Sequence, residues 1–179
     1  MSRAAARSGI LAAAIAGLAL SAVGQNPPAP DGWRPFKATW TLSGTRQLLP
    51  TEGARSAAIL HLTGPLAVTN GEGLGRGFLG EVIGYDDSGA LVVGRAVLTD
   101  EKGDRIYCSL KAEPFGTGRK ATGTITGGTG RYAGLEGTFT FAWQYVVAPE
   151  SGEISGRIAN IEGRTRHAPP KAVPAEPPK

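Results

Sequence analysis

The chain has 179 residues, 41% of them hydrophobic, and a formal charge of +4. This length suits one domain that buries a core of its own. No basic stripe with interleaved aromatic residues is present, which excludes the common nucleic-acid-binding patterns. The single cysteine excludes an internal disulfide. Composition leaves open a ligand carrier, an enzyme and a structural protein.

The first 24 residues have the pattern of a signal peptide. Arg3 and Arg7 precede an apolar stretch over Gly9–Leu20, and small residues at Ala22–Gly24 favour cleavage before Gln25. The apolar stretch is shorter than the roughly 20 residues that a membrane-spanning helix needs. We therefore expect a secreted or periplasmic protein with no membrane span after cleavage. An uncleaved N-terminal anchor is the alternative.

Proline-containing segments frame the folded part of the chain. Residues 25–31 are expected to form a spacer, and residues 167–179, with five prolines, a disordered tail. The domain is therefore expected to span residues 32–166. Once the two arginines of the signal peptide are removed, 17 basic residues face 15 acidic ones, so the mature chain is nearly neutral.

Apolar residues between these segments recur with a period of two, and no stretch keeps a helical period, which is typical of strands. The expected strands are Trp33–Leu42, Ser56–Thr69, Gly73–Tyr85, Leu91–Thr99, Asp104–Ala112, Thr122–Thr126, Glu136–Val147 and Ile154–Gly163. Eight strands joined in sequence by short turns predict an all-β, eight-stranded antiparallel up-and-down barrel, which leaves no strand edge unpaired. Its interior would be filled by side chains or hold one small ligand.

One strand carries most of the aromatic residues. Phe139, Phe141, Trp143 and Tyr145 share one face, and together with Trp40 they are the candidate ligand-binding residues. Three interpretations remain open. The aromatic face lines a cavity for a small apolar molecule, fills the barrel, or is buried against a neighbouring subunit.

Acidic residues accompany two of the expected turns. They are Asp86, Asp87, Asp100, Glu101 and Asp104, and their spacing does not match a calcium-binding loop. Because aspartate is favoured in turns for local hydrogen bonding, we expect these residues to be solvated.

A cysteine and a histidine are the remaining candidates for a nucleophile or a metal ligand. Cys108 shares one face of the expected strand with Ile106 and Leu110, which predicts a buried, unreactive thiol. His61 alternates with the apolar residues beside it, which predicts an exposed or interfacial histidine. His61 is the only histidine of the expected folded region, since His167 lies in the expected tail, and one histidine and one cysteine far apart cannot form a metal site. We expect no metal and no cofactor.

A glycine-rich turn over Gly127–Gly137 (GGTGRYAGLEG) lacks the spacing of a nucleotide-binding loop. We interpret it as structural, with Tyr132 packing beneath it to plug one end of the barrel. The residues assigned to this structural turn are Gly127, Gly128, Gly130, Tyr132, Gly134 and Gly137.

Two segments carry a family resemblance. Gly123–Phe139 resembles the signature turn of bacterial proteins with an allene oxide cyclase-like barrel, relatives of plant allene oxide cyclases and dirigent proteins. Leu98–Tyr107, an acidic turn leading into a strand, is similar to a second pattern of this family. The resemblance implies a calycin-like eight-stranded barrel with an apolar cavity, often a homotrimer. It also implies proteins that steer a bound substrate by its conformation, with little covalent chemistry.

The leading hypothesis is an exported barrel that binds a small apolar molecule. A second hypothesis is an isomerase or cyclase in which Glu81 or Tyr145 donates or accepts a proton. A third is a structural envelope protein whose barrel is packed solid and whose proline-rich tail reaches a partner.

Overall fold

The computed structural model describes residues 32–52, 56–87, 90–112, 120–147 and 152–168. The expected signal peptide, the spacer and tail residues 169–179 lie outside these ranges. Within them, no helix has the length and apolar character needed to cross a membrane.

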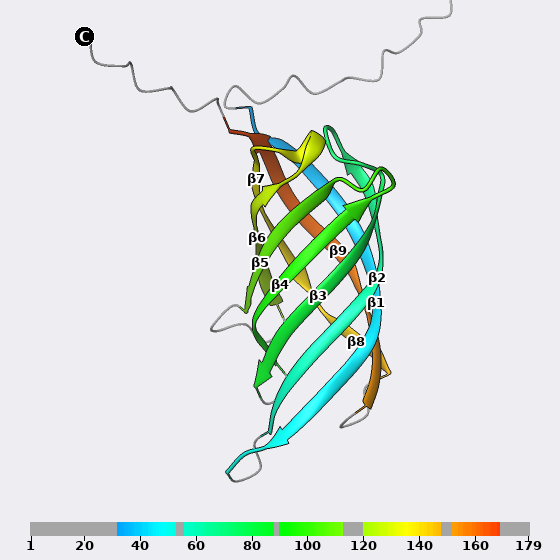
Figure 1. Cartoon of the computed structure of the whole chain (residues 1–179), viewed down its shortest axis with the longest axis vertical. Coiled ribbons are helices and arrows are strands. Elements are labelled where there is room, and N and C mark those ends of the chain that lie inside the picture. Colours follow the sequence, from blue (N-terminus) through cyan, green and yellow to red (C-terminus); the bar gives the residue numbers. More distant parts are fainter. Residues whose placement is uncertain (1–31, 53–55, 88–89, 113–119, 148–151, 169–179) are drawn as a thin grey trace, which may run out of the picture.

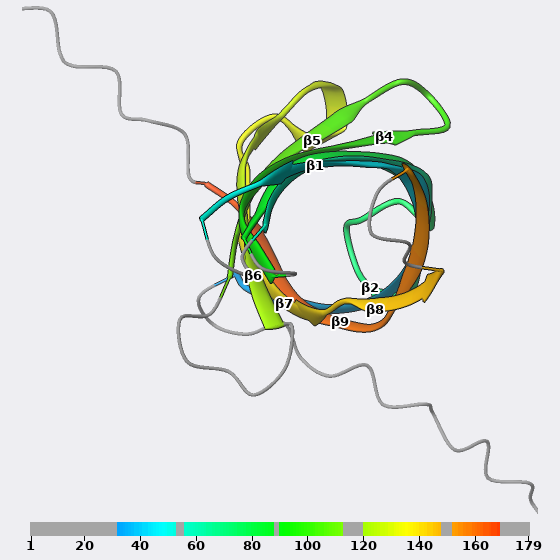
Figure 2. The ribbon, with the colours of Figure 1, turned by 90° about the horizontal axis from the view of Figure 1, so that it is seen from below.

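The described strands form one antiparallel sheet that closes on itself (Figures 1 and 2). The strands are β1 (Arg34–Pro50), β2 (Ser56–Gly71), β3 (Gly77–Asp87), β4 (Ala90–Asp100), β5 (Arg105–Ala112), β6 (Lys120–Gly128), β7 (Leu135–Ala142), β8 (Gln144–Val147) and β9 (Gly152–His167). A short 3-10 helix, η1 (Gly130–Tyr132), lies between β6 and β7. Each strand pairs with the next along the chain as far as β7, and β1 pairs with β9 to close the ring.

The sheet has eight strand positions because β7 and β8 share one. Residues Leu135–Thr140 of β7 pair with the last part of β9, and β8 pairs with an earlier part of the same strand. Trp143 separates the two and belongs to neither. The expected all-β, eight-stranded up-and-down barrel is therefore confirmed, and the expected strand Glu136–Val147 is interrupted at Trp143.

Three expected strand ends were wrong by four residues or more, those at the end of β1, at the start of β3 and at the end of β9, which continues past Gly163 to His167. β1 continues past Leu42 because Gly44 stays in the sheet and pairs with Leu62. β3 begins only at Gly77, because the chain first turns through a segment closed by a 2.9 Å hydrogen bond from the Val68 N–H to the Arg76 carbonyl.

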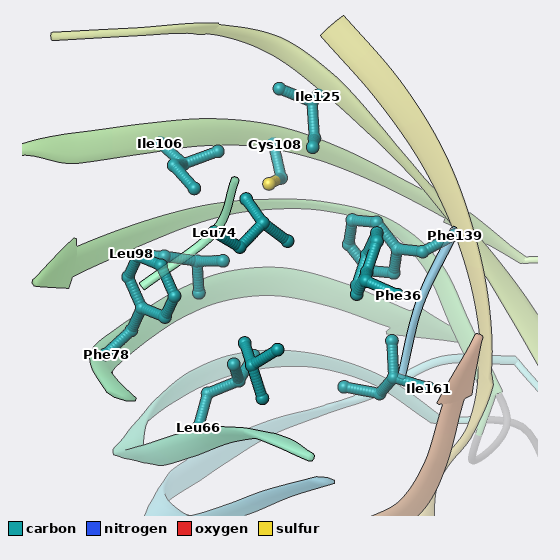
Figure 3. Close-up of a pocket in the computed structure, with 11 residues that line it drawn as sticks. Phe36, Leu66, Leu74, Phe78, Leu98, Ile106, Cys108, Ile125, Phe139 and Ile161 are labelled. Carbon is teal, nitrogen blue, oxygen red and sulfur yellow. The ribbon is translucent and has the colours of Figure 1, made fainter. Parts of the chain in front are cut away.

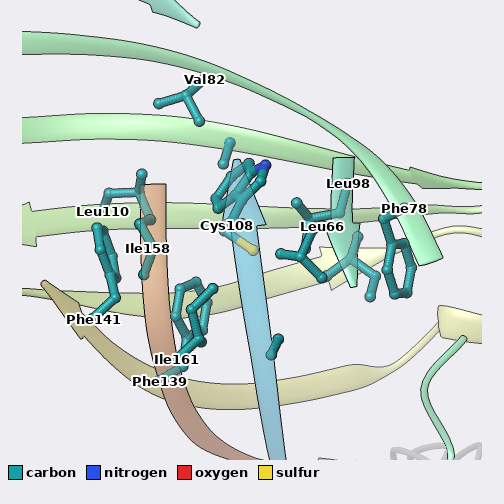
Figure 4. Close-up of a cluster of buried hydrophobic side chains, with 14 of the residues drawn as sticks. Leu66, Phe78, Val82, Leu98, Cys108, Leu110, Phe139, Phe141, Ile158 and Ile161 are labelled. Carbon is teal, nitrogen blue, oxygen red and sulfur yellow. The ribbon is translucent and has the colours of Figure 1, made fainter. Parts of the chain in front are cut away.

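Side chains alternate between the interior and the outer surface along each strand, as the pleat requires. On β3, Phe78, Val82 and Asp86 point inward, Gly80 and Gly84 between them are also buried, and the odd-numbered residues are exposed. Buried side chains from all around the ring meet in one cluster (Figure 4). Fully burying a Leu, Ile or Phe side chain contributes roughly 1.5–3 kcal/mol, so this interior is the main source of stability.

The glycine-rich turn closes the upper end of the barrel in Figure 1. Tyr132 is fully buried there, with its ring centroid 5.7 Å from that of Phe78. Gly130 and Gly134 have φ values of +53° and +74°, a region in which other residues are strained. The remaining turn glycines lie in the flanking strands, Gly127 and Gly128 at the end of β6 and Gly137 in β7.

The Tyr132 hydroxyl is the centre of a hydrogen-bond network. It accepts from Arg131 Nε at 2.9 Å and from the Gly75 N–H at 3.3 Å, and it donates to the Asp100 carboxylate. Burial and the neighbouring Asp100 carboxylate raise the pKa of Tyr132 above its ordinary value, although Arg131 opposes the shift. Tyr132 thus joins η1 to the β2–β3 and β4–β5 turns.

Asp100 is buried within this network, so the expectation that it is solvated was wrong. Burial alone raises its pKa, but hydrogen bonds from the Lys102 N–H, Tyr132, Arg131 and the Asp104 N–H together hold that pKa below its ordinary value. Arg131 Nη2 lies 2.5 Å from Asp100 Oδ2, and the Arg131 N–H donates to Asp104. The two sequence segments that carry the family resemblance therefore meet in this network.

Candidate functional site

The upper half of the barrel interior is filled by apolar side chains. A cavity of about 20 Å³ remains there, room for about one water molecule. Its lining residues are Phe36, Leu66, Val68, Leu74, Phe78, Leu98, Ile106, Cys108, Ile125, Phe139 and Ile161. Figure 3 shows Phe36 and Phe139 on one side of it and Leu74 entering among the other side chains. This half of the interior is too small for a ligand of ordinary size.

The aromatic residues predicted to line the site all face the interior. Trp40, Phe139 and Phe141 are buried in the core, and Trp143 and Tyr145 are partly buried against it. The aromatic face of β7 and β8 therefore lies on the inside of the barrel. This placement fits residues that line a cavity or fill the barrel, and it does not fit burial against a neighbouring subunit. Phe139 and Phe141 help to fill the core (Figure 4), whereas Trp143 and Tyr145 lie farther along toward the opposite end.

Trp40 is held by close contacts with β2 and β3. Its indole N–H donates to the Gly64 carbonyl at 3.1 Å. Its ring also lies so close to Gly80 that a Cβ added there would overlap it. Glycine at position 80 is therefore what leaves room for the indole inside the barrel. Trp40 is part of the packed wall and is only 2% exposed.

Polar side chains meet inside the lower end of the barrel in Figure 1, where β1 and β3 end. The Tyr145 hydroxyl donates to Asp86 Oδ2 at 3.5 Å, and Arg46 Nη2 lies 3.6 Å from Asp86 Oδ1. Trp143 packs edge-on against Tyr145, with ring centroids 5.4 Å apart. We call Arg46, Asp86, Trp143 and Tyr145 the mouth cluster. It combines a charged pair, a phenol and an indole at the end of an apolar interior.

Asp86 corrects a second expectation, because it is buried rather than solvated, with a side chain 1% exposed. β3 extends through Asp87, and its alternation turns Asp86 inward together with Val82. A buried carboxylate needs compensating partners, which Arg46 and Tyr145 supply. The sequence analysis missed Arg46 altogether. The inward alternation of β3 was the available signal for Asp86.

Glu81 lies on the outer surface of the barrel. Its carboxylate is 3.0 Å from His61 Nε2, and both side chains are more than half exposed. Glu81 is therefore not positioned to act on a molecule inside the barrel, because inward positions on β3 are the even-numbered ones. His61 lies on the outer surface, which agrees with the expectation of an exposed or interfacial histidine.

Cys108 is 1% exposed, and burial raises its pKa to about 12. A thiol in this state has almost no thiolate at neutral pH, which confirms the expected burial and agrees with the prediction that the cysteine is unreactive. Among the described residues, no group of three or more His, Cys, Asp or Glu side chains is arranged to hold a metal ion.

The mouth cluster is thus the place inside the described barrel where polar chemistry and partly accessible aromatic rings occur together. Comparisons of the chain with protein families and with curated proteins gave no match. The architecture itself, a closed eight-stranded antiparallel barrel, is compatible with a calycin-like fold.

Proposed function

We propose that the protein is an exported barrel that binds a small, largely apolar molecule at its lower mouth. The observation that carries this proposal is the convergence of Arg46, Asp86 and Tyr145 from three strands inside an otherwise apolar interior. Export follows from the signal-peptide pattern of the first 24 residues.

The energetics of the mouth cluster support a binding role. A buried ion pair often contributes no more to stability than apolar residues of the same size, because its desolvation offsets its attraction. Arg46 and Asp86 are therefore expected to be retained for recognition. Trp143 and Tyr145 would contact the apolar body of the ligand, and the polar groups would fix its orientation.

The first test is native mass spectrometry of the mature chain purified from the exported fraction of its host. A bound compound of a few hundred daltons would support the proposal and give the class of the ligand. The second test is titration with the neutral fluorescent probe N-phenyl-1-naphthylamine. We expect Trp143→Ala to weaken probe binding at least tenfold, whereas Trp33→Ala, at the opposite end of the barrel, leaves it unchanged. Probe binding that is insensitive to Trp143→Ala would contradict the proposal.

A packed structural barrel is the alternative supported by the 20 Å³ cavity in the upper interior. In this case no ligand would be bound on purification, and the probe would not bind saturably to the folded protein. Deleting residues 168–179 would then abolish association with an envelope partner.

An isomerase or cyclase is the alternative supported by the contact between Tyr145 and Asp86. Tyr145 would donate or accept a proton while the barrel holds the substrate in a reactive conformation. Tyr145→Phe would then abolish conversion of the molecule found by mass spectrometry and leave its binding intact. Equal conversion by this variant would exclude Tyr145 as the proton-transfer group.

Self-association is supported by an apolar area on the outer surface of β2, β3 and β4. Ile59, Ile83, Tyr85 and Val93 are between 41% and 59% exposed there, and Tyr85 pairs with both Ile59 and Val93 across the sheet. Outer faces of antiparallel sheets are usually polar. The homotrimer implied by the family resemblance stays a prediction, which the subunit count in the native mass spectrum tests.

A further inference from the structure

A second hollow lies at the closed end of the barrel, away from the mouth cluster. Its volume is about 260 Å³, more than ten times that of the interior cavity. It is formed by the start of β1, the β2–β3 turn, the start of β7 and the end of β9. Among the residues that line it are Arg34, Glu72, Leu135, Thr165, Arg166 and His167.

The cationic side chains that line this hollow can bind an anion. Arg34 and Arg166 provide two permanent cations and His167 an imidazole, whereas Glu72 provides a carboxylate and Glu136 a second one that pairs with Arg166. Arg34 and Thr165 are directly paired across β1 and β9, so Arg34 and Arg166 come from adjacent strands. An arginine guanidinium matches the geometry of a carboxylate through two parallel hydrogen bonds.

Arg166 is held in place before any ligand binds. Its guanidinium carbon lies 4.5 Å from the centroid of the Trp33 ring, and its Nε is 2.5 Å from Glu136 Oε1. The ring and the carboxylate fix the plane of the guanidinium, so less side-chain entropy is lost when a ligand binds. Because the guanidinium lies over the Trp33 ring, the NMR signal of the Trp33 indole should change when a ligand binds to Arg166.

The floor of the hollow adds a hydroxyl group and an apolar surface. Thr165 is 3% exposed and Leu135 is 4% exposed, yet both line the hollow. His167 Nδ1 lies 3.3 Å from the Ala133 carbonyl oxygen. Because a carbonyl can only accept, Nδ1 carries the proton in this contact, and Nε2 is the other ring nitrogen with which His167 can bind a ligand.

We propose that this hollow binds a small organic acid through a single carboxylate. Arg34 and Arg166 bind the carboxylate, Thr165 supplies a further polar contact, and Leu135 contacts the apolar part. His167 Nε2 can accept a hydrogen bond from a hydroxyl or N–H group of the ligand. Glu72 opposes a second negative charge, which favours a monoanion over phosphate or a polycarboxylate. The volume is slightly below the range of about 300–1,000 Å³ that is typical of ligand pockets, which favours a small molecule.

The proposal is tested by ¹H–¹⁵N NMR of the three tryptophan indole groups, with the Trp33 signal assigned by Trp33→Phe. The probes are benzoate, its neutral analogue benzamide, and inorganic phosphate. We expect benzoate to shift the Trp33 signal saturably and to leave the Trp143 signal unchanged. Benzamide binding as tightly as benzoate, or phosphate binding more tightly, would overturn the proposed ligand class. The absence of a saturable shift with all three probes would overturn the site.

Arg34→Gln and Arg166→Gln are each expected to weaken benzoate binding at least tenfold. Arg157→Gln is the matched control, because Arg157 lies on the same strand, β9, nearer its other end. Equal weakening by Arg157→Gln would show a general effect of charge and overturn the site. Arg34→Gln leaves the Arg166–Glu136 ion pair in place. If Arg166→Gln impairs folding, the affinity of Arg34→Gln for benzoate therefore tests the site by itself. Because Trp33 and Trp143 lie at opposite ends of the barrel, their separate NMR signals distinguish binding in this hollow from binding at the mouth cluster.

Discussion

Replacing Tyr132 with phenylalanine tests whether the network at the closed end holds the barrel together. The ring and its contact with Phe78 are retained, so no cavity forms. What is lost is the hydroxyl, which accepts from Arg131 and Gly75 and donates to Asp100. A hydrogen bond contributes about 1 kcal/mol net, or about 1.5–3 kcal/mol when one partner is charged.

We therefore expect Tyr132→Phe to lower the free energy of unfolding by about 2–3 kcal/mol, because the three lost bonds are not additive. For a domain of this size the melting temperature would fall by about 10 °C. The assay is urea denaturation followed by tryptophan fluorescence, with the midpoint compared at constant m-value.

Tyr107→Phe is the control. Tyr107 is a partly exposed residue of the outer surface of β5, where loss of a hydroxyl should change stability by less than about 0.5 kcal/mol. If the two variants are equally stable, the Tyr132 hydroxyl does not stabilise the closed end and the reasoning fails.

Three further predictions concern the packed interior and the buried acid. Gly80→Val should lower the free energy of unfolding by about 3 kcal/mol or more, because the new side chain overlaps the Trp40 ring. Gly77→Ala is the control in the same denaturation assay and should be nearly neutral, because a Cβ there meets no atom within 4 Å. Cys108 should react with a disulfide reagent only after unfolding, which absorbance measurements with and without guanidinium chloride would show; rapid labelling of the folded chain would contradict its burial. Because the pKa of Asp100 is lowered on folding, its contribution to stability is present above the ordinary aspartate pKa and is lost as the pH falls through the lower, folded value. Asp100→Asn should therefore reduce the loss of unfolding free energy as the pH is lowered into the acid range. If the variant and the original protein lose stability equally in acid, the Asp100 carboxylate does not contribute in this way.

The architecture could be predicted from the sequence because the period-two pattern reports directly on which face of a strand is buried. Phe139 and Phe141 alternate with threonines, and their inward orientation follows once the barrel closes. The same rule applied to β3 would have placed Glu81 outside, since it lies between Gly80 and Val82. Residue type alone therefore does not place a carboxylate inside the barrel.

The mouth cluster could not be predicted because its partners are distant in sequence. Arg46 and Asp86 come from β1 and β3, and Tyr145 from β8, so only the curvature of the closed sheet brings them together. Asp86 also resembles a turn residue, because aspartate followed by Asp, Ser and Gly is typical of turns. In the structure the strand continues far enough to bury the first aspartate.

The pairing of β1 with β9 has a consequence for how the protein folds. The partners Arg34 and Thr165 lie at opposite ends of the domain, so the ring cannot close before the last strand is present. Contacts between residues so far apart in sequence make folding slow. Until closure, β1 has one unpaired edge beside Phe36 and Trp40, and such an edge can pair with another chain. Aggregation during refolding should therefore decrease when chains are kept dilute until the ring has closed.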